Sequence, residues 1–159
     1  MHLVKRKMSI DFAVDILGWK YEVPYDLYND EPNSEVIDEM LENPHFVIVN
    51  QDDELIGYYC FGKSAQVPAG NKINVYAESY IDIGVGMKPN LTGKGFGNTF
   101  FSFILQDLQV IHPNTPMRLT VATFNKRAIH LYENFGFAKN KQFNSDAAEF
   151  ITMIRGSSE

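Results

Sequence analysis

The chain has 159 residues, the length of one domain, and 45% of them are hydrophobic and 21% charged, which predicts a globular rather than a disordered protein. The formal net charge of -6 argues against a nucleic-acid partner and favours a cationic one. The chain has no apolar run of 18 residues, and its basic N-terminus lacks the apolar stretch of a signal peptide, so we expect no membrane association.

Cysteine and histidine usage bounds the chemistry further. Cys60 is the only cysteine, so no disulfide can form within the chain, and we expect a reducing, cytoplasmic location. With one cysteine and four scattered histidines, neither a zinc site nor another metal cofactor is expected. Residues 1–159 are predicted to form a single domain.

The first half of the chain predicts two helices and several strands. Residues 10–17 have an amphipathic helical pattern, with Ser9 as its N-cap and Gly18 at its end. A second helix is predicted over about 33–43, and residues 19–32 between the two helices form an aromatic, proline-containing loop. The strands predicted in this half cover residues 2–8, 46–50 and 55–61.

The second half predicts a strand over about 73–87, a helix over 95–112 and a strand over 117–122, a unit whose two strands run parallel. A helix over 126–135 follows, ended by Gly136. The last strands cover residues 137–143 and 150–154. The element order is therefore β-α-α-β-β-β-α-β-α-β-β, which predicts an α/β fold with a mixed central sheet and helices on both of its faces.

Residues 85–97 contain the end of a strand, a glycine-rich loop and the start of a helix. Gly93, Gly95 and Gly97 let a bulky ligand approach the backbone, and the helix start presents N–H groups to an anion such as a phosphate. The stretch does not fit the P-loop pattern, because no glycine lies in frame before Lys-Ser or Lys-Thr. It does not fit the dinucleotide pattern G-x-G-x-x-G either. We therefore expect a phosphate-bearing ligand of another kind.

Two separated blocks resemble the GNAT superfamily of N-acetyltransferases. Residues 85–97, V-G-M-K-P-N-L-T-G-K-G-F-G, are similar to the end of the family's fourth strand and its [QR]-x-x-G-x-[GA] pyrophosphate loop. Thr92 stands where the family usually has Gln or Arg. Residues 125–137, N-K-R-A-I-H-L-Y-E-N-F-G-F, are similar to the family block N-x-x-A-x-x-L-Y-x-x-x-G-F. The predicted element order also matches the family fold over nearly the whole chain.

The resemblance implies that acetyl-CoA binds between splayed middle strands. It assigns backbone contacts with the pantetheine arm to Val85, Gly86 and Met87, as a strand adds to a sheet edge, and a hydrogen bond with the arm to Asn125. The residues that it assigns to the pyrophosphate are Gly93, Lys94, Gly95, Phe96, Gly97 and Asn98.

The resemblance also implies that a primary amine attacks the thioester directly, with an acid for the leaving thiolate and a route for the amine proton. Tyr132 is the expected acid, and the alternative is a core aromatic. Asp82 is the candidate base for the amine proton. The alternative is that Asp82 is a structural carboxylate and that water alone carries the proton. The loop over 19–32 holds four aromatics together with Asp26, Asp30 and Glu31, which either bind a cation through ring faces and charge or cover the core.

The sequence thus predicts an acetyl-CoA-dependent N-acetyltransferase that acts on a primary amine, with a small molecule favoured. Three alternatives stay open: an acyl-CoA-binding sensor without efficient catalysis, a protein or peptide N-acetyltransferase, and a transferase of a longer acyl group. A homodimer is compatible with the sequence.

Overall fold

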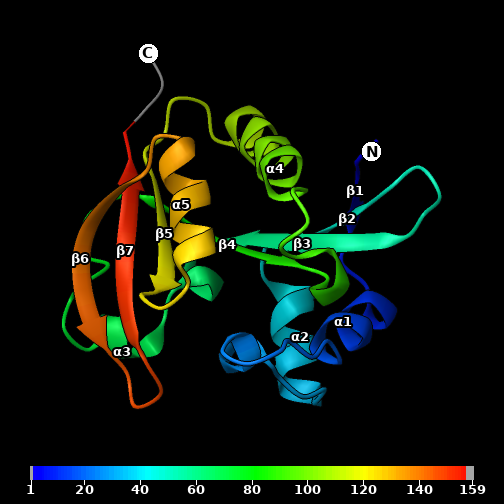
Figure 1. Cartoon of the computed structure of the whole chain (residues 1–159), viewed down its shortest axis with the longest axis horizontal. Helices are drawn as coiled ribbons and strands as arrows, with labels where there is room; N and C mark the ends of the chain where they lie inside the picture. Colours follow the sequence, from blue (N-terminus) through cyan, green and yellow to red (C-terminus); the bar gives the residue numbers. More distant parts are fainter. Residues whose placement is uncertain (1, 157–159) are drawn as a thin grey trace. The chain divides into compact units, whose positions relative to one another are not determined.

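The computed structural model describes residues 2–156, which form a mixed sheet with helices (Figure 1). The strands are β1 (Val4–Lys7), β2 (His45–Val49), β3 (Leu55–Phe61), β4 (Ile81–Met87), β5 (Met117–Ala122), β6 (Ala138–Asn144) and β7 (Glu149–Arg155). The α-helices are α1 (Ile10–Leu17), α2 (Ser34–Glu42), α3 (Pro68–Asn71), α4 (Gly97–Ile111) and α5 (Lys126–Asn134). The strand order β1-β2-β3-β4-β5-β7-β6 and the mixture of parallel and antiparallel pairs confirm the predicted fold class.

The chain folds into two compact units. One unit runs up to Cys60 and from Val85 to Phe100, and the other runs from Phe61 to Gly84 and from Phe101 onward. β3, β4 and α4 are each divided between the units, because the boundaries fall after Cys60, after Gly84 and after Phe100.

The core of the first unit forms where α1 and α2 pack with β2. Its buried members are Ala13, Ile16, Leu17, Met40 and Val47. The predicted cap of α1 is confirmed, because the Ser9 hydroxyl accepts the N–H of Phe12, and α2 is capped in the same way by the Asn33 side chain, which accepts the N–H of Val36. These caps satisfy N–H groups that the first helical turn leaves without partners, which fixes where each helix starts.

The second unit is built around β5. This strand pairs parallel with β4 over Ile81–Ile83 and antiparallel with β7 along its whole length, and β6 and β7 form an antiparallel pair. The predicted parallel unit and the final hairpin are therefore confirmed. An aromatic cluster in this unit joins Phe101 to the rings of Tyr132, Phe135 and Phe137.

The largest difference from prediction lies in residues 73–80. The long strand expected from residue 73 is wrong for these eight positions, because β4 begins only at Ile81. The segment turns instead: Asn74 has a φ of 60°, and the rings of Tyr76 and Tyr80 lie 4.9 and 5.1 Å from the guanidinium carbon of Arg118. The other predicted elements begin and end within two residues of the observed ones, and the short α3 lies between residues 61 and 73, where no helix or strand was predicted.

Candidate functional site

The glycine-rich loop between β4 and α4 leaves a run of backbone N–H groups without protein acceptors. Within the described part of the chain, the N–H groups of residues 93–98 donate to no acceptor. Gly93 and Gly95 adopt φ values of 71° and 85°, and a Cβ at Gly95 would meet nothing within 4 Å. Successive amides in such a turn, ahead of the 15-residue helix α4, form a concave site for an anion.

Thr92 contributes to the shape of this loop. Its hydroxyl and its N–H both donate to the carbonyl of Pro89, at 2.7 and 3.2 Å, which closes a short 3₁₀ turn over Pro89–Leu91. The side chain that stands where the family usually has Gln or Arg is therefore engaged locally. Lys94 is exposed and is the basic residue within the run of unbonded amides.

The end of β4 is packed too closely to accept a side chain at Gly86. A Cβ there would lie 2.2 Å from a ring carbon of Tyr58, and a Cβ at Gly57 on β3 would lie 2.5 Å from the Gly86 carbonyl oxygen. Val85, Gly86 and Met87 are all half-buried. The Met87 carbonyl accepts a hydrogen bond from the Tyr21 hydroxyl at 2.7 Å. The contact of Tyr21 with β4 was not predicted, and its only signal in the sequence was the high aromatic content of residues 19–32.

Two of the predicted site residues lie in the second unit, on α5. Asn125 is its N-cap, and the side-chain oxygen accepts the N–H of Ala128 at 3.1 Å. Tyr132 is only 7% exposed, and its ring centroid lies 5.1 Å from that of Phe101. This burial agrees with the core-aromatic alternative, and the role of acid stays a prediction.

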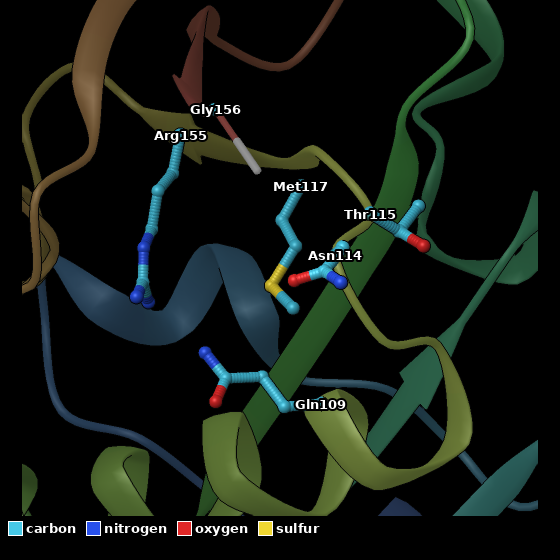
Figure 2. A pocket seen from close by; sticks show the side chains of 6 residues that line it. All are labelled: Gln109, Asn114, Thr115, Met117, Arg155 and Gly156. Atoms are coloured by element: carbon cyan, nitrogen blue, oxygen red, sulfur yellow. The ribbon is translucent and has the colours of Figure 1, made fainter. Parts of the chain in front are cut away.

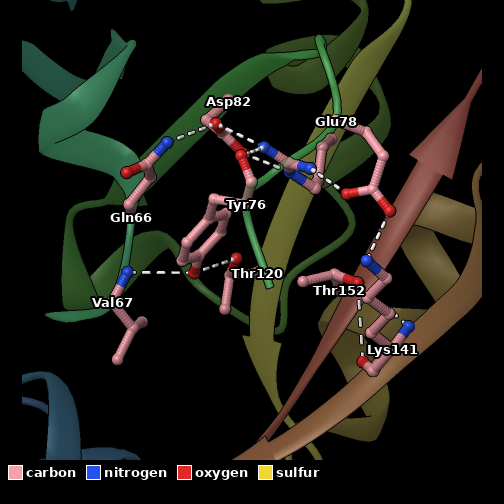
Figure 3. Close-up of polar contacts among 9 residues, drawn as sticks. Gln66, Val67, Tyr76, Glu78, Asp82, Thr120, Lys141 and Thr152 are labelled. Atoms are coloured by element: carbon pink, nitrogen blue, oxygen red, sulfur yellow. Dashed lines mark hydrogen bonds and ion pairs between the residues drawn. The ribbon is translucent and has the colours of Figure 1, made fainter. Parts of the chain in front are cut away.

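Asp82 is buried in a bidentate ion pair with Arg118. Asp82 and Arg118 are 4% and 1% exposed and face each other in the register of β4 and β5. The guanidinium donates to the two carboxylate oxygens at 2.6 and 2.9 Å, and the Gln66 amide donates to Oδ2 at 2.8 Å (Figure 3). Burial lowers the pKa of Arg118, but the hydrogen bonds and charge of Asp82 outweigh it, so this pKa lies above its usual value.

These contacts favour the structural alternative for Asp82. Both carboxylate oxygens accept hydrogen bonds from Arg118 or Gln66, and the side chain is almost fully buried, so little of it is open to an acceptor amine. Its role as the general base stays a prediction. The signal that would have found the Asp82–Arg118 pair was a charged residue of opposite sign at the second position of each of two parallel, mainly apolar strands.

Further polar contacts join this pair to neighbouring segments. The Tyr76 hydroxyl shares a hydrogen bond with Thr120 at 2.8 Å and accepts the N–H of Val67 at 2.9 Å (Figure 3). Glu78 pairs with Lys141, and this hydrogen bond holds the pKa of the Glu78 carboxyl below its usual range. The network is therefore a brace for residues 62–80 against β4 and β5.

Other features of the described residues offer little as sites. A shallow pocket in the second unit is lined by Gln109, Asn114, Thr115, Met117, Arg155 and Gly156 (Figure 2). Its volume of about 10 Å³ accommodates about one water molecule. Over residues 2–156, no group of three or more His, Cys, Asp or Glu side chains could hold a metal ion. No helix in the same range has the length and apolarity to cross a membrane.

Comparison with known families gives one match that covers most of the chain. Residues 13–137 match the sequence model of the Acetyltransferase (GNAT) family. This range contains the glycine-rich loop and the whole second block over residues 125–137, and it runs through both compact units. No curated protein sequence matches this chain significantly.

Several solved structures are similar to this chain along nearly its full length. A chimera of spermidine N-acetyltransferase SpeG from Vibrio cholerae and hSSAT has a TM-score of 0.68 and 22% identity, covering 98% of this chain and 96% of that one. A protein from Acinetobacter baylyi ADP1, described as a candidate acetyltransferase, has a TM-score of 0.70 and 15% identity, covering 97% and 92%. A candidate phosphinothricin N-acetyltransferase has a TM-score of 0.65 and 17% identity, covering 99% of both chains. At these identities the likeness shows the fold.

Proposed function

Because this chain belongs to the acetyltransferase (GNAT) family, we propose that it transfers the acetyl group of acetyl-CoA to a primary amine, with a small cationic amine as the favoured acceptor. The observation that carries the proposal is the run of unbonded N–H groups over residues 93–98. A CoA thioester carries the pyrophosphate that such a run of amides can bind.

The donor would be held by residues of the two blocks that resemble the family, 85–97 and 125–137. The amides of residues 93–98 would bind its pyrophosphate, and the exposed Lys94 would add positive charge. Val85, Gly86 and Met87 would offer backbone groups to the pantetheine arm, and Asn125 a side-chain amide. When bound, acetyl-CoA supplies the acetyl group as an activated thioester.

The charge distribution supports a cationic acceptor. Ten of the chain's 20 acidic residues lie within residues 11–42, where Lys20 is the only basic one. These residues form α1, α2 and the loop between them, so the negative potential is concentrated on that part of the first unit. One structural relative is named a spermidine N-acetyltransferase, which makes a polyamine a sensible first acceptor to test.

Proton transfer is assigned to one side chain and to water. We propose that Tyr132 provides the proton for the leaving thiol. The ammonium form of the acceptor would lose its proton to water, since the contacts of Asp82 leave its carboxylate oxygens occupied by Arg118 and Gln66.

A thermal-shift titration with acetyl-CoA, free CoA and ATP tests the donor site. Ligand at about 100 times its dissociation constant adds about 2.7 kcal/mol to the free energy of unfolding, which is a shift of several degrees. Both CoA forms should shift the unfolding midpoint, and ATP should not. An unchanged midpoint with both CoA forms would contradict the proposal at its first step.

Acceptor chemistry is then tested by thiol titration of released CoA with spermidine, putrescine, lysine and a short peptide with a primary N-terminal amine. Background from the enzyme should be low, because Cys60 is the only cysteine and is 4% exposed. Turnover with a di- or polyamine above that with the peptide is expected. A preference for the peptide would instead support the protein or peptide N-acetyltransferase.

Replacing Tyr132 by Phe separates the enzyme from its main alternative. We expect Tyr132→Phe to lower kcat about 10²- to 10⁴-fold, the usual contribution of a general acid, and to leave the CoA-induced thermal shift intact. The engaged carboxylate of Asp82 favours a second candidate, an acyl-CoA-binding sensor without efficient catalysis. For that sensor the wild type would show the CoA shift without turnover, so the substitution would change nothing.

A further inference from the structure

The loop over residues 19–32 is joined to the end of β4 by a partly buried hydrogen bond. The Tyr21 hydroxyl donates to the Met87 carbonyl at 2.7 Å, across 66 positions of the sequence. Both residues belong to the first unit, and Tyr21 is half-buried. Met87 is one of the three β4 residues assigned to the pantetheine arm, so this bond lies directly on the proposed donor edge.

A second, apolar contact links the same two segments. The ring of Trp19 lies 6.2 Å from that of Tyr58 on β3, and the Tyr58 ring covers the Cα of Gly86 so closely that no Cβ fits there. The loop therefore reaches two consecutive residues of β4 by independent routes: Met87 through the Tyr21 hydroxyl, and Gly86 through the neighbouring rings of Trp19 and Tyr58.

The loop is also braced internally around Tyr21. The Tyr21 N–H donates to the Asn29 side chain at 2.7 Å, and the Lys20 ammonium donates to the Asp30 carbonyl at 3.1 Å. The Tyr21 and Tyr28 rings meet edge to face with centroids 6.4 Å apart. Since these contacts span the loop, a displacement at Tyr21 is transmitted to its acidic residues.

We propose that Tyr21 is a positioning residue: its hydroxyl fixes the acidic loop to the Met87 carbonyl and so holds the acceptor-binding side chains in place beside the donor edge. This inference rests on the proposed function for its acceptor and donor assignments. The Tyr21 side chain is neutral, so the Tyr21–Met87 hydrogen bond is independent of the acidic residues that favour a cationic amine.

The hydroxyl keeps its proton under assay conditions. Burial raises the pKa of Tyr21 to about 12, so the phenol remains a donor throughout the pH range in which the protein would be assayed. The positioning effect should therefore be independent of pH between about 6 and about 9, well below that pKa.

Limited proteolysis tests the anchor without reference to activity. Lys20 is exposed and lies in the loop, so trypsin cleavage after it reports the fraction of loop that is open. In Tyr21→Phe, which removes only the hydroxyl, cleavage should be about three- to tenfold faster, the effect of one lost hydrogen bond on local opening. Tyr80→Phe is the matched control: within residues 2–156 the Tyr80 hydroxyl makes no hydrogen bond, and its ring contact with Arg118 survives. Its cleavage rate should equal that of the wild type.

Kinetics with spermidine as the probe then test positioning. Tyr21→Phe should raise the KM for spermidine several-fold and leave both kcat and the acetyl-CoA-induced thermal shift within about twofold of wild type. Cleavage at the wild-type rate, an unchanged spermidine KM, or an equal loss of acetyl-CoA affinity would each overturn the inference. A wild type that releases no CoA with any amine would overturn the proposed function instead, while the proteolysis still decides whether Tyr21 anchors the loop.

Discussion

At the scale of single residues, the Asp82–Arg118 pair sets the stability of the second unit. Both side chains are almost fully buried, and each is the main partner of the other's charge. Arg118→Met should lower the free energy of unfolding by about 3–5 kcal/mol, because it leaves a carboxylate buried with only Gln66 as a donor. Adding Asp82→Leu should restore much of that loss, which denaturant unfolding of the two single variants and the double variant would measure.

Strictly additive losses in this cycle would show that the ion pair is not what stabilises the unit. The same variants also examine the catalytic alternative for Asp82. A structural carboxylate predicts that Asp82→Asn loses stability and keeps its kcat per folded molecule. A large fall in kcat at unchanged unfolding free energy would make Asp82 the base.

His45 gives the fold a sensitivity to acid. It is 8% exposed, and burial lowers the pKa of its imidazole despite the nearby Asn43 carbonyl and the charge of Glu39. Below about pH 6.5, the usual histidine pKa, the unfolded chain takes up a proton that the folded chain resists, so stability falls as pH decreases. His45→Gln should reduce the loss of unfolding free energy between about pH 7.5 and about pH 5.5. An identical pH dependence in wild type and variant would exclude His45 as the cause.

At the scale of elements, the packing of β3 against β4 depends on Gly57. A Cβ there would lie 2.5 Å from both the Gly86 carbonyl and the Phe100 ring. Gly57→Ala should therefore lower the free energy of unfolding by about 1–3 kcal/mol, as expected for overpacking. Gly156→Ala is the matched control, since a Cβ at Gly156 meets nothing within 4 Å. Equal unfolding midpoints for the two variants would mean that the strands can relax.

Elements formed by interactions between near neighbours in the sequence were predicted correctly, and the segment that depends on a distant partner was not. The caps at Ser9 and Asn33 and the run of apolar and aromatic residues in β3 are local, and the elements that they define agree with prediction. Residues 73–80 have enough apolar and aromatic residues for a strand, but Tyr76 and Tyr80 lie over Arg118, about 40 positions away. Local pattern carries no information about that partner.

The candidate site shows the same division. The glycine-rich loop is encoded by adjacent residues, and the structure gives it the unbonded amides that the pattern indicated. The Tyr21–Met87 bond joins distant segments and could not be found from either segment alone. The ion pair of Asp82 depends on strand register, which fixes its partner only after the fold is known.

At the scale of the whole molecule, charge is unevenly distributed along the chain. Residues 11–42 hold ten acids and one base, although the whole chain has a net charge of only -6. The kcat/KM for spermidine should therefore fall as ionic strength rises from about 0.01 M to about 0.15 M, where the Debye length shortens from about 30 to about 8 Å. A primary monoamine of similar size is the control and should show a shallower slope. Equal slopes would argue against steering by the acidic segment.

The contact between Trp19 and Tyr58 also makes the protein its own optical probe. Trp19 is the only tryptophan in the chain, and it lies at the base of the loop over 19–32, one ring away from Gly86. Its emission can therefore be excited selectively and read without a label. A change in emission wavelength or quenching on adding acetyl-CoA or an amine would report events at this corner of the first unit in real time, in stopped flow and in single-turnover experiments.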